Sequence, residues 1–208
     1  MIRAFAVAGM VAAAVWIVAL FIEYQYGLRT PGGGSAAYQA DQTAFLIASV
    51  GYLALLIGLF RFKAAGDGLF GRVAVAIWII ALTAVALSQA LSFVAVSAVF
   101  LLPIGGVGQI LGSLFTSIAV WRSRRWTGWH RWAPAIWTAT FFVTIGAAIT
   151  AIPILSIPAA SPNPTAPSPV LEGLWQVAWF LLGLALYIEA GRSPKPYVPA
   201  EEMRARLR

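Results

Sequence analysis

Long stretches of apolar residues, separated by short polar segments, account for most of the chain. A helix that crosses the roughly 30 Å apolar core of a bilayer needs about 20 apolar residues. Six stretches come close to that length, at approximately 4–22, 43–60, 73–90, 93–121, 133–155 and 169–189. Their apolar residues are continuous rather than alternating with polar ones, which favours helices over membrane β-strands. The pattern therefore predicts an all-α, polytopic transmembrane bundle of six helices.

These stretches divide the chain into a transmembrane domain, residues 1–190, and a short basic tail, residues 191–208. The first stretch is longer than the apolar region of a signal peptide and no cleavage pattern follows it, so we expect it to remain as a membrane span. The fourth stretch is the longest, and Pro103 is expected to break its helix.

The composition agrees with a membrane protein. Of the 208 residues, 61% are hydrophobic and only 10% are charged, and the mean hydropathy is +0.84. Soluble domains carry about 25% charged residues, which argues against a soluble enzyme. The sequence has no cysteine and a single histidine, His130, so thiolate chemistry and multi-histidine metal sites are excluded. We find no catalytic motif, and we therefore expect no enzyme activity, no metal and no cofactor.

The net charge of +7 comes from 14 basic residues that are unevenly distributed. If the chain crosses the membrane six times, thirteen of them lie on one side and only Arg29 lies on the other. Basic residues concentrate on the cytoplasmic side, which puts both termini in the cytoplasm. Five or seven crossings would divide the basic residues between the two sides. Because arginine, alanine, valine and glycine abound, we expect a high-GC bacterial genome and hence a multi-pass protein of the bacterial plasma membrane.

The loop between the fourth and fifth stretches combines basic and aromatic residues. Its arginines are Arg122, Arg124, Arg125 and Arg131, and tryptophans accompany them. This composition is typical of segments that meet anionic lipid headgroups, and we predict that these arginines bind such headgroups. A role in setting the membrane topology alone is the alternative. The loop is short and lies next to the predicted bilayer, which argues against nucleic acid as a partner.

Polar residues gather at the opposite ends of the predicted helices. We predict that five of them line an outward-facing, mildly acidic pocket for a cationic or hydrogen-bonding small molecule: Glu23, Tyr26, Gln89, Glu172 and Gln176. The alternative is structural, because an acidic residue near the start of a helix, such as Glu172, stabilises that helix end. At the other end of the sixth stretch, Glu189 is expected to pair with Arg192, three residues later.

Small residues in the fourth stretch predict close helix packing. Gly108 and Gly112 are four residues apart, and such a pair lets another helix approach closely. We expect this contact to lie within the chain. A face for a second copy, or a kink that lines a ligand site, is the alternative.

The sequence also contains a candidate internal repeat. Residues 9–20 match residues 71–82 at eight of twelve positions, including Trp16 with Trp78. Trp137 in the fifth stretch matches the same position. Three repeated helical hairpins would explain these matches, and chance similarity among segments built from few residue types is the alternative.

The layout, with Arg125, Trp126, Gly128 and Trp129 directly before the fifth stretch, resembles uncharacterised small six-span membrane proteins of high-GC Gram-positive bacteria. The resemblance implies a six-helix membrane fold and no established activity.

Pattern and composition together predict a non-enzymatic integral membrane protein. We expect it to bind or help move a small or lipidic molecule, or to support a membrane assembly. Its partners would be the lipid bilayer and, further, a second copy or another membrane protein. Two alternatives stay open: the substrate-binding subunit of a vitamin-type transporter, and an intramembrane enzyme.

Overall fold

The computed structural model describes residues 1–26, 36–92, 100–150 and 169–192, and this part of the chain is helical and without strands. The long helices are α1 (Ile2–Tyr26), α2 (Ala36–Phe62), α3 (Leu69–Ser92), α4 (Leu101–Ser123), α5 (Ala133–Thr150) and α6 (Pro169–Glu189). A short 3-10 helix, η1 (Gly128–Trp132), precedes α5. The predicted all-α class is confirmed for these residues.

Helix α4 begins later than the sequence predicts. Its first residue is Leu101, whereas the apolar stretch starts at residue 93, and residues 93–99 lie outside the described part. Pro103 therefore sits in the first turn of α4, where the missing amide hydrogen breaks no helical hydrogen bond. Pro103 does not interrupt α4 itself, and residues 93–99, on the other side of the predicted break, lie outside the described part.

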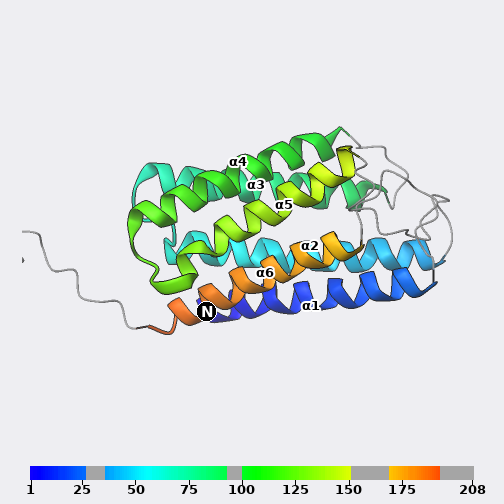
Figure 1. Cartoon of the computed structure of the whole chain (residues 1–208), viewed down its shortest axis with the longest axis horizontal. Coiled ribbons are helices and arrows are strands. Elements are labelled where there is room, and N and C mark those ends of the chain that lie inside the picture. The colour runs from blue at the N-terminus through cyan, green and yellow to red at the C-terminus, as the bar shows by residue number, and fades with distance from the viewer. Residues whose placement is uncertain (27–35, 93–99, 151–168, 193–208) are drawn as a thin grey trace, which may run out of the picture.

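The six long helices form a closed ring, which Figure 1 shows from the side. Each helix packs against the one that follows it in the chain, and α6 returns to pack against α1. Across the ring, the described helices make only a small contact, between α2 and α6. The N-terminus and the end of α6 lie at the same end of the bundle (Figure 1). Consecutive helices thus run in opposite directions, and the two described connections, from α2 to α3 and from α4 to α5, lie at the same end of the ring.

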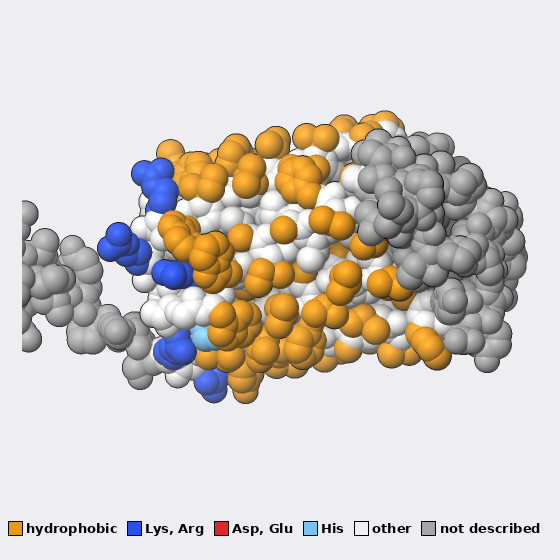
Figure 2. All heavy atoms as spheres, viewed as in Figure 1, with side chains coloured by type: hydrophobic (Ala, Val, Ile, Leu, Met, Phe, Trp, Pro, Cys, Tyr) orange, Lys and Arg blue, Asp and Glu red, His pale blue; other side chains and the backbone are white. Residues whose placement is uncertain are grey.

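Apolar side chains cover the outside of the ring as well as its inside. Val11, Val50, Ile80 and Val107 are all more than half exposed, and Figure 2 shows hydrophobic side chains along the visible length of the bundle. Exposed apolar surface of this extent is typical of a membrane-facing protein.

Five helices, α1, α2, α3, α4 and α6, are long and apolar enough to cross a membrane. Helix α5, with 18 residues, is not among them. The sequence predicts that the fifth span continues to residue 155, but residues 151–155 lie outside the described part. Five of the six predicted spans are therefore matched by a helix of membrane-crossing length and composition.

Aromatic side chains from four helices fill the middle of the ring of helices. Trp137 of α5 stands edge-on to Trp78 of α3 and to Trp179 of α6, with ring centroids 4.7 and 5.0 Å apart. Tyr52 of α2 stacks on Trp179 at 4.4 Å, and its hydroxyl donates a hydrogen bond to Oε1 of Gln176. Edge-to-face and stacked rings attract each other beyond their shared burial. We call Trp78, Trp137 and Trp179 the indole cluster; it joins α3 to α5 and α6, two helices that α3 does not otherwise contact.

Positions matched in the candidate repeat share burial and backbone conformation. Trp16, Trp78 and Trp137 are all buried. Beyond the ends of α2 and α4, Lys63 and Arg124 both have a left-handed backbone, with φ angles of 55° and 52°. The first two hairpins therefore end in the same backbone conformation.

Candidate functional site

One end of the ring carries all the Lys and Arg side chains of the described residues (Figure 2). At this end α1, α3 and α5 begin and α2, α4 and α6 end. Nine basic residues lie there with two carboxylates, Asp67 and Glu189. The basic residues are Arg3, Arg61, Lys63, Arg72, Arg122, Arg124, Arg125, Arg131 and Arg192. The uneven charge predicted from the sequence is confirmed for this part of the chain, and we call this end the cationic end.

Asp67, in the loop between α2 and α3, is the exposed carboxylate of the cationic end. It pairs with Nζ of Lys63 at 2.9 Å and with the guanidinium of Arg125. The hydrogen bond from Lys63, helped by the positive charges of Arg125 and Arg72, holds the pKa of Asp67 below its usual range. Arg125 also donates to the backbone carbonyl of Lys63 at 3.4 Å. Arg125, one of the predicted headgroup residues, is therefore engaged within the chain.

Glu189, the last residue of α6, is only 5% exposed and gathers groups from the loop before α5. Its Oε1 accepts hydrogen bonds from the backbone N–H of Thr127 (3.2 Å) and from Arg192 (2.7 Å). The same oxygen lies 2.6 Å from Nδ1 of His130, which is 4% exposed. Arg192 also donates to the hydroxyl of Thr127. We call these four residues the Glu189 hub.

The predicted pair of Glu189 with Arg192 is confirmed by this geometry. The other two members of the hub were not predicted. Thr127 and His130 lie 62 and 59 residues from Glu189 in the sequence, and no local pattern links such distant positions. The isolated histidine in a largely apolar chain was the one available signal.

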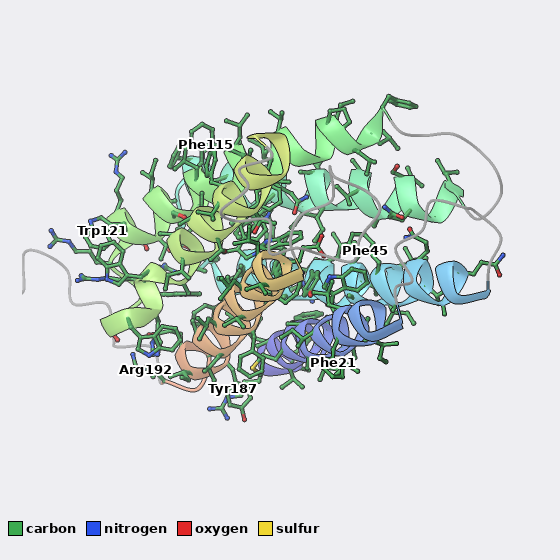
Figure 3. The ribbon with its side chains drawn as sticks, turned by 45° about the vertical axis from the view of Figure 1, so that its right-hand side comes forward. Phe21, Phe45, Phe115, Trp121, Tyr187 and Arg192 are labelled. Atoms are coloured by element: carbon green, nitrogen blue, oxygen red, sulfur yellow. The ribbon has the colours of Figure 1, made fainter. Side chains whose placement is uncertain are left out.

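Beside the Glu189 hub, the cationic end is hollowed into a groove of about 450 Å³. It is lined by Trp121, Arg124, Trp126, Thr127, Gly128 and Arg131, and we call it the Arg–Trp groove. Trp126, only 2% exposed, is its most deeply buried member. Figure 3 shows Trp121 and Arg192 at the same end of the bundle. Thr127 belongs both to the groove and to the hub, so the hub fixes one side of the groove.

Arg131 is held by aromatic contacts, and Arg124 has an unusual backbone conformation. The guanidinium of Arg131 lies 4.5 Å from the ring centroid of Trp121 and 5.7 Å from that of Trp132, which are favourable cation–π distances. Arg124 follows the end of α4 in the left-handed conformation, with φ 52°. That conformation costs a residue other than glycine about 1–2 kcal/mol, and such strained positions cluster at functional sites.

Neither Arg124 nor Arg131 has a carboxylate within ion-pair distance among the described residues. A planar guanidinium can bind two oxygens of a phosphate or carboxylate at once. The neighbouring indole rings offer contact to apolar or sugar-like groups. The groove is therefore suited to an anionic group that is attached to a less polar one.

The structure separates the four arginines that were predicted to bind headgroups. Arg124 and Arg131 come together in the Arg–Trp groove, and Arg125 is held by Asp67. Arg122 is exposed on the last turn of α4 and does not line the groove.

The residues predicted to line a pocket at the opposite end are only partly described. Gln176 is 1% exposed and is hydrogen-bonded beside the indole cluster, so the structure places it in the core. Gln89 and Glu172 are partly exposed, and each takes part in an interaction. The side chains of Glu23 and Tyr26 lie outside the described part.

Gly108 and Gly112 face α3 of the same chain. A Cβ at Gly108 would lie 2.7 Å from Cβ of Ala81, and a Cβ at Gly112 would lie 2.6 Å from backbone atoms of Trp78. Only glycine permits this approach of α4 to α3. The two glycines are therefore covered within the chain and do not offer a face to a second copy.

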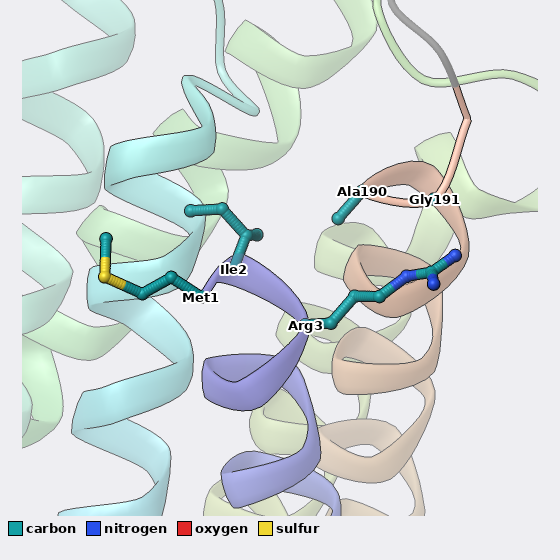
Figure 4. Close-up of a pocket in the computed structure, with 5 residues that line it drawn as sticks. All are labelled: Met1, Ile2, Arg3, Ala190 and Gly191. Atoms are coloured by element: carbon teal, nitrogen blue, oxygen red, sulfur yellow. The ribbon is translucent and has the colours of Figure 1, made fainter.

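A second hollow at the cationic end lies between the start of α1 and the end of α6 (Figure 4). It measures about 390 Å³ and is lined by Met1, Ile2, Arg3, Ala190 and Gly191. Its guanidinium, that of Arg3, lies 4.9 Å from the ring centroid of Tyr187. With a single guanidinium and no aromatic lining, it is a weaker anion site than the Arg–Trp groove.

Comparison with protein-family models, with curated proteins and with solved structures found no match to this chain. Its function is therefore inferred from the geometry of the chain alone.

Proposed function

We propose that this chain is an integral membrane protein that crosses the membrane six times and holds the acidic headgroup of a membrane lipid in the Arg–Trp groove, without catalysing a reaction. Its cationic end faces the cytoplasm, in keeping with the positive-inside rule, and both termini lie there. The acidic lipids of a bacterial plasma membrane would be the ligands.

The closed ring favours six crossings over five. Helix α5 lies between α4 and α6 and packs against both. The hydroxyl of Thr144 on α5 donates to the backbone carbonyl of Leu171 on α6 at 3.2 Å. With α4 and α6 in the bilayer, α5 has to cross beside them.

The Arg–Trp groove lies where the apolar surface of the ring meets its cationic end. Trp121, Trp129 and Trp132 are exposed there, and tryptophan is enriched at the membrane–water interface. Basic residues beside a span attract acidic lipids by about 1 kcal/mol each. The observation that carries the proposal is the pair Arg124 and Arg131, two arginines without carboxylate partners among the described residues, in one aromatic groove.

Lipid retention in native mass spectrometry tests the proposal. Wild-type protein in mild detergent is incubated with acidic and zwitterionic lipids of matched acyl chains, and it should retain the acidic lipid. The double variant Arg124→Gln, Arg131→Gln should lose most of this retention, because both guanidinium groups of the groove are gone.

A second double variant, Arg72→Gln with Arg122→Gln, is the matched control. It removes the same charge from exposed positions outside the groove and should keep most of the acidic lipid. Equal losses in the two double variants would show that general charge attraction holds the lipid. A wild-type protein that retains no acidic lipid would contradict the proposal.

A further inference from the structure

The donors available in the Arg–Trp groove favour one kind of acidic group. We infer that the groove takes a terminal phosphate, either a phosphate monoester or the end of a diphosphate, in preference to a phosphodiester. This inference rests on the proposed function and concerns the same site.

The donors of Thr127 are already in use. Its backbone N–H and its hydroxyl both donate to Oε1 of Glu189, at 3.2 and 3.4 Å. The charged donors of the groove are the guanidinium groups of Arg124 and Arg131, each with five N–H donors in a planar fork. A terminal phosphate presents three acceptor oxygens, and a phosphodiester presents one fewer. Two forks are matched better by the larger number of acceptors.

The charge balance points the same way. Both described carboxylates of the cationic end, Asp67 and Glu189, already have cationic partners. Arg124 and Arg131 therefore keep their positive charges uncompensated among the described residues. A terminal phosphate carries about −1.5 to −2 charges at neutral pH, whereas a phosphodiester carries a single one. The terminal phosphate neutralises both arginines.

The groove has room beyond the phosphate itself. Its volume of about 450 Å³ exceeds that of one phosphate group, and Trp121 and Trp126 line part of the remainder. At Gly128, whose φ is 60°, no atom lies within 4 Å of the place where a Cβ would be, so the groove is open on that side. This space suits the glycerol or sugar that joins a phosphate to a lipid chain.

The test compares phosphatidic acid, phosphatidylglycerol and phosphatidylcholine with the same acyl chains, retained by wild-type protein in native mass spectrometry. Phosphatidic acid should be retained over phosphatidylglycerol by about tenfold, because one more charge-assisted hydrogen bond changes the affinity by about that factor. Equal retention of the two acidic lipids, both above phosphatidylcholine, would overturn this inference and leave the proposed function standing. If neither acidic lipid is retained above phosphatidylcholine, both this inference and the proposed function are overturned.

Arginine-to-lysine variants test whether the forks are responsible. Arg131→Lys and Arg124→Lys keep the charge but remove the fork, so the preference for phosphatidic acid over phosphatidylglycerol should fall towards equality while total acidic lipid changes little. Arg122→Lys, outside the groove, should keep the wild-type preference. An unchanged preference in both groove variants would overturn the role of the forks.

A soluble phosphate monoester separates the two sources of this chemistry. Glycerol 3-phosphate is added to delipidated protein in detergent and its binding is measured by calorimetry. Binding much weaker than that of phosphatidic acid supports a lipid ligand. Binding as tight as that of phosphatidic acid would support the terminal-phosphate chemistry and overturn the lipid source.

Discussion

The middle of the ring and its cationic end are held together by different physical interactions. In the middle, the indole cluster joins α3, α5 and α6 through ring contacts of 4.7 to 5.7 Å, and glycines bring α4 against α3. At the cationic end, Glu189 and Asp67 fix the loops through hydrogen bonds and ion pairs. Among the described residues, buried titratable groups other than tyrosine occur only at that end, at Glu189 and His130.

This difference separates groups that hold the fold from groups that are available to a ligand. In the middle, every member of the indole cluster is fully buried by its neighbours. At the cationic end, Arg125 and Arg192 are bound to carboxylates, whereas Arg124 and Arg131 have no such partner among the described residues. We therefore expect variants in the middle to change stability and variants in the Arg–Trp groove to change lipid retention.

The largest effect is expected for the indole cluster. Trp179→Ala removes a fully buried ring that contacts Trp78, Trp137 and Tyr52, and it should lower the free energy of unfolding by about 3–5 kcal/mol. Trp129→Ala, at an exposed tryptophan of the cationic end, is the control and should cost far less. Denaturant unfolding in detergent measures both. Similar losses of unfolding free energy in the two variants would show that the indole cluster stabilises the fold no more than an exposed tryptophan does.

The close contact of α4 with α3 comes next. Gly112→Ala places a methyl group 2.6 Å from the backbone of Trp78, and such overpacking should cost about 1–3 kcal/mol. Gly106→Ala is the same change on the same helix, where no atom lies within 4 Å, and it should be neutral or slightly stabilising. The thermal unfolding midpoints of the two variants test this difference. A stable Gly112→Ala variant would mean that the two helices are not held at this distance.

The Glu189 hub should matter less to global stability than the middle of the ring. Glu189→Ala leaves the N–H of Thr127 and the ring of His130 without their acceptor, which costs about 1–3 kcal/mol. The low end of this range applies, because Arg192 is 49% exposed and water can replace the carboxylate there. Asp67→Ala, at an exposed pair, should cost less in the same unfolding experiment. The reverse order would contradict the role given to the hub.

The smallest effect is the pH dependence of the Asp67 contact. The pKa of Asp67 is lowered in the folded protein. Its ion pairs therefore contribute fully to the free energy of unfolding above the usual pKa of 3.8, and this contribution is lost as the pH falls through the lowered pKa. The contact should therefore persist at pH 4. Carbon NMR of the Asp67 carboxyl group follows the titration directly. A midpoint at or above the usual value would show that Lys63 and Arg125 do not engage this carboxylate in solution.

Helix number and charge placement could be predicted because they depend on the composition of long segments. The apolar stretches give the long helices, and the arginines between them give the cationic end. Which face of a helix is buried could not be predicted in the same way. In a membrane helix the lipid-facing side is also apolar, so the periodicity that marks a core in soluble proteins is weak. Gln89 and Gln176 look alike in the sequence, yet only Gln176 is buried in the core.

The sequence predicted which loop carries the candidate site, but not which of its side chains come together. The basic and aromatic composition singled out the segment between α4 and α5. Arg124 and Arg131 line the groove, whereas Arg125 does not, because Arg125 pairs with Asp67 and because Thr127 is hydrogen-bonded to Glu189. Those contacts join residues about sixty positions apart, and the sequence alone carries no signal for them.

Cysteine accessibility in intact cells tests most directly that the ring crosses the membrane six times with its cationic end in the cytoplasm. The chain has no cysteine, so single variants Gln39→Cys, Gly68→Cys and Ser168→Cys report on the start of α2, the loop before α3 and the residue before α6. An impermeant thiol reagent should label the Gln39→Cys and Ser168→Cys variants in intact cells, and Gly68→Cys only after permeabilisation. A Ser168→Cys variant that is protected in intact cells would mean that α5 does not cross, and labelling of Gly68→Cys in intact cells would place the cationic end outside.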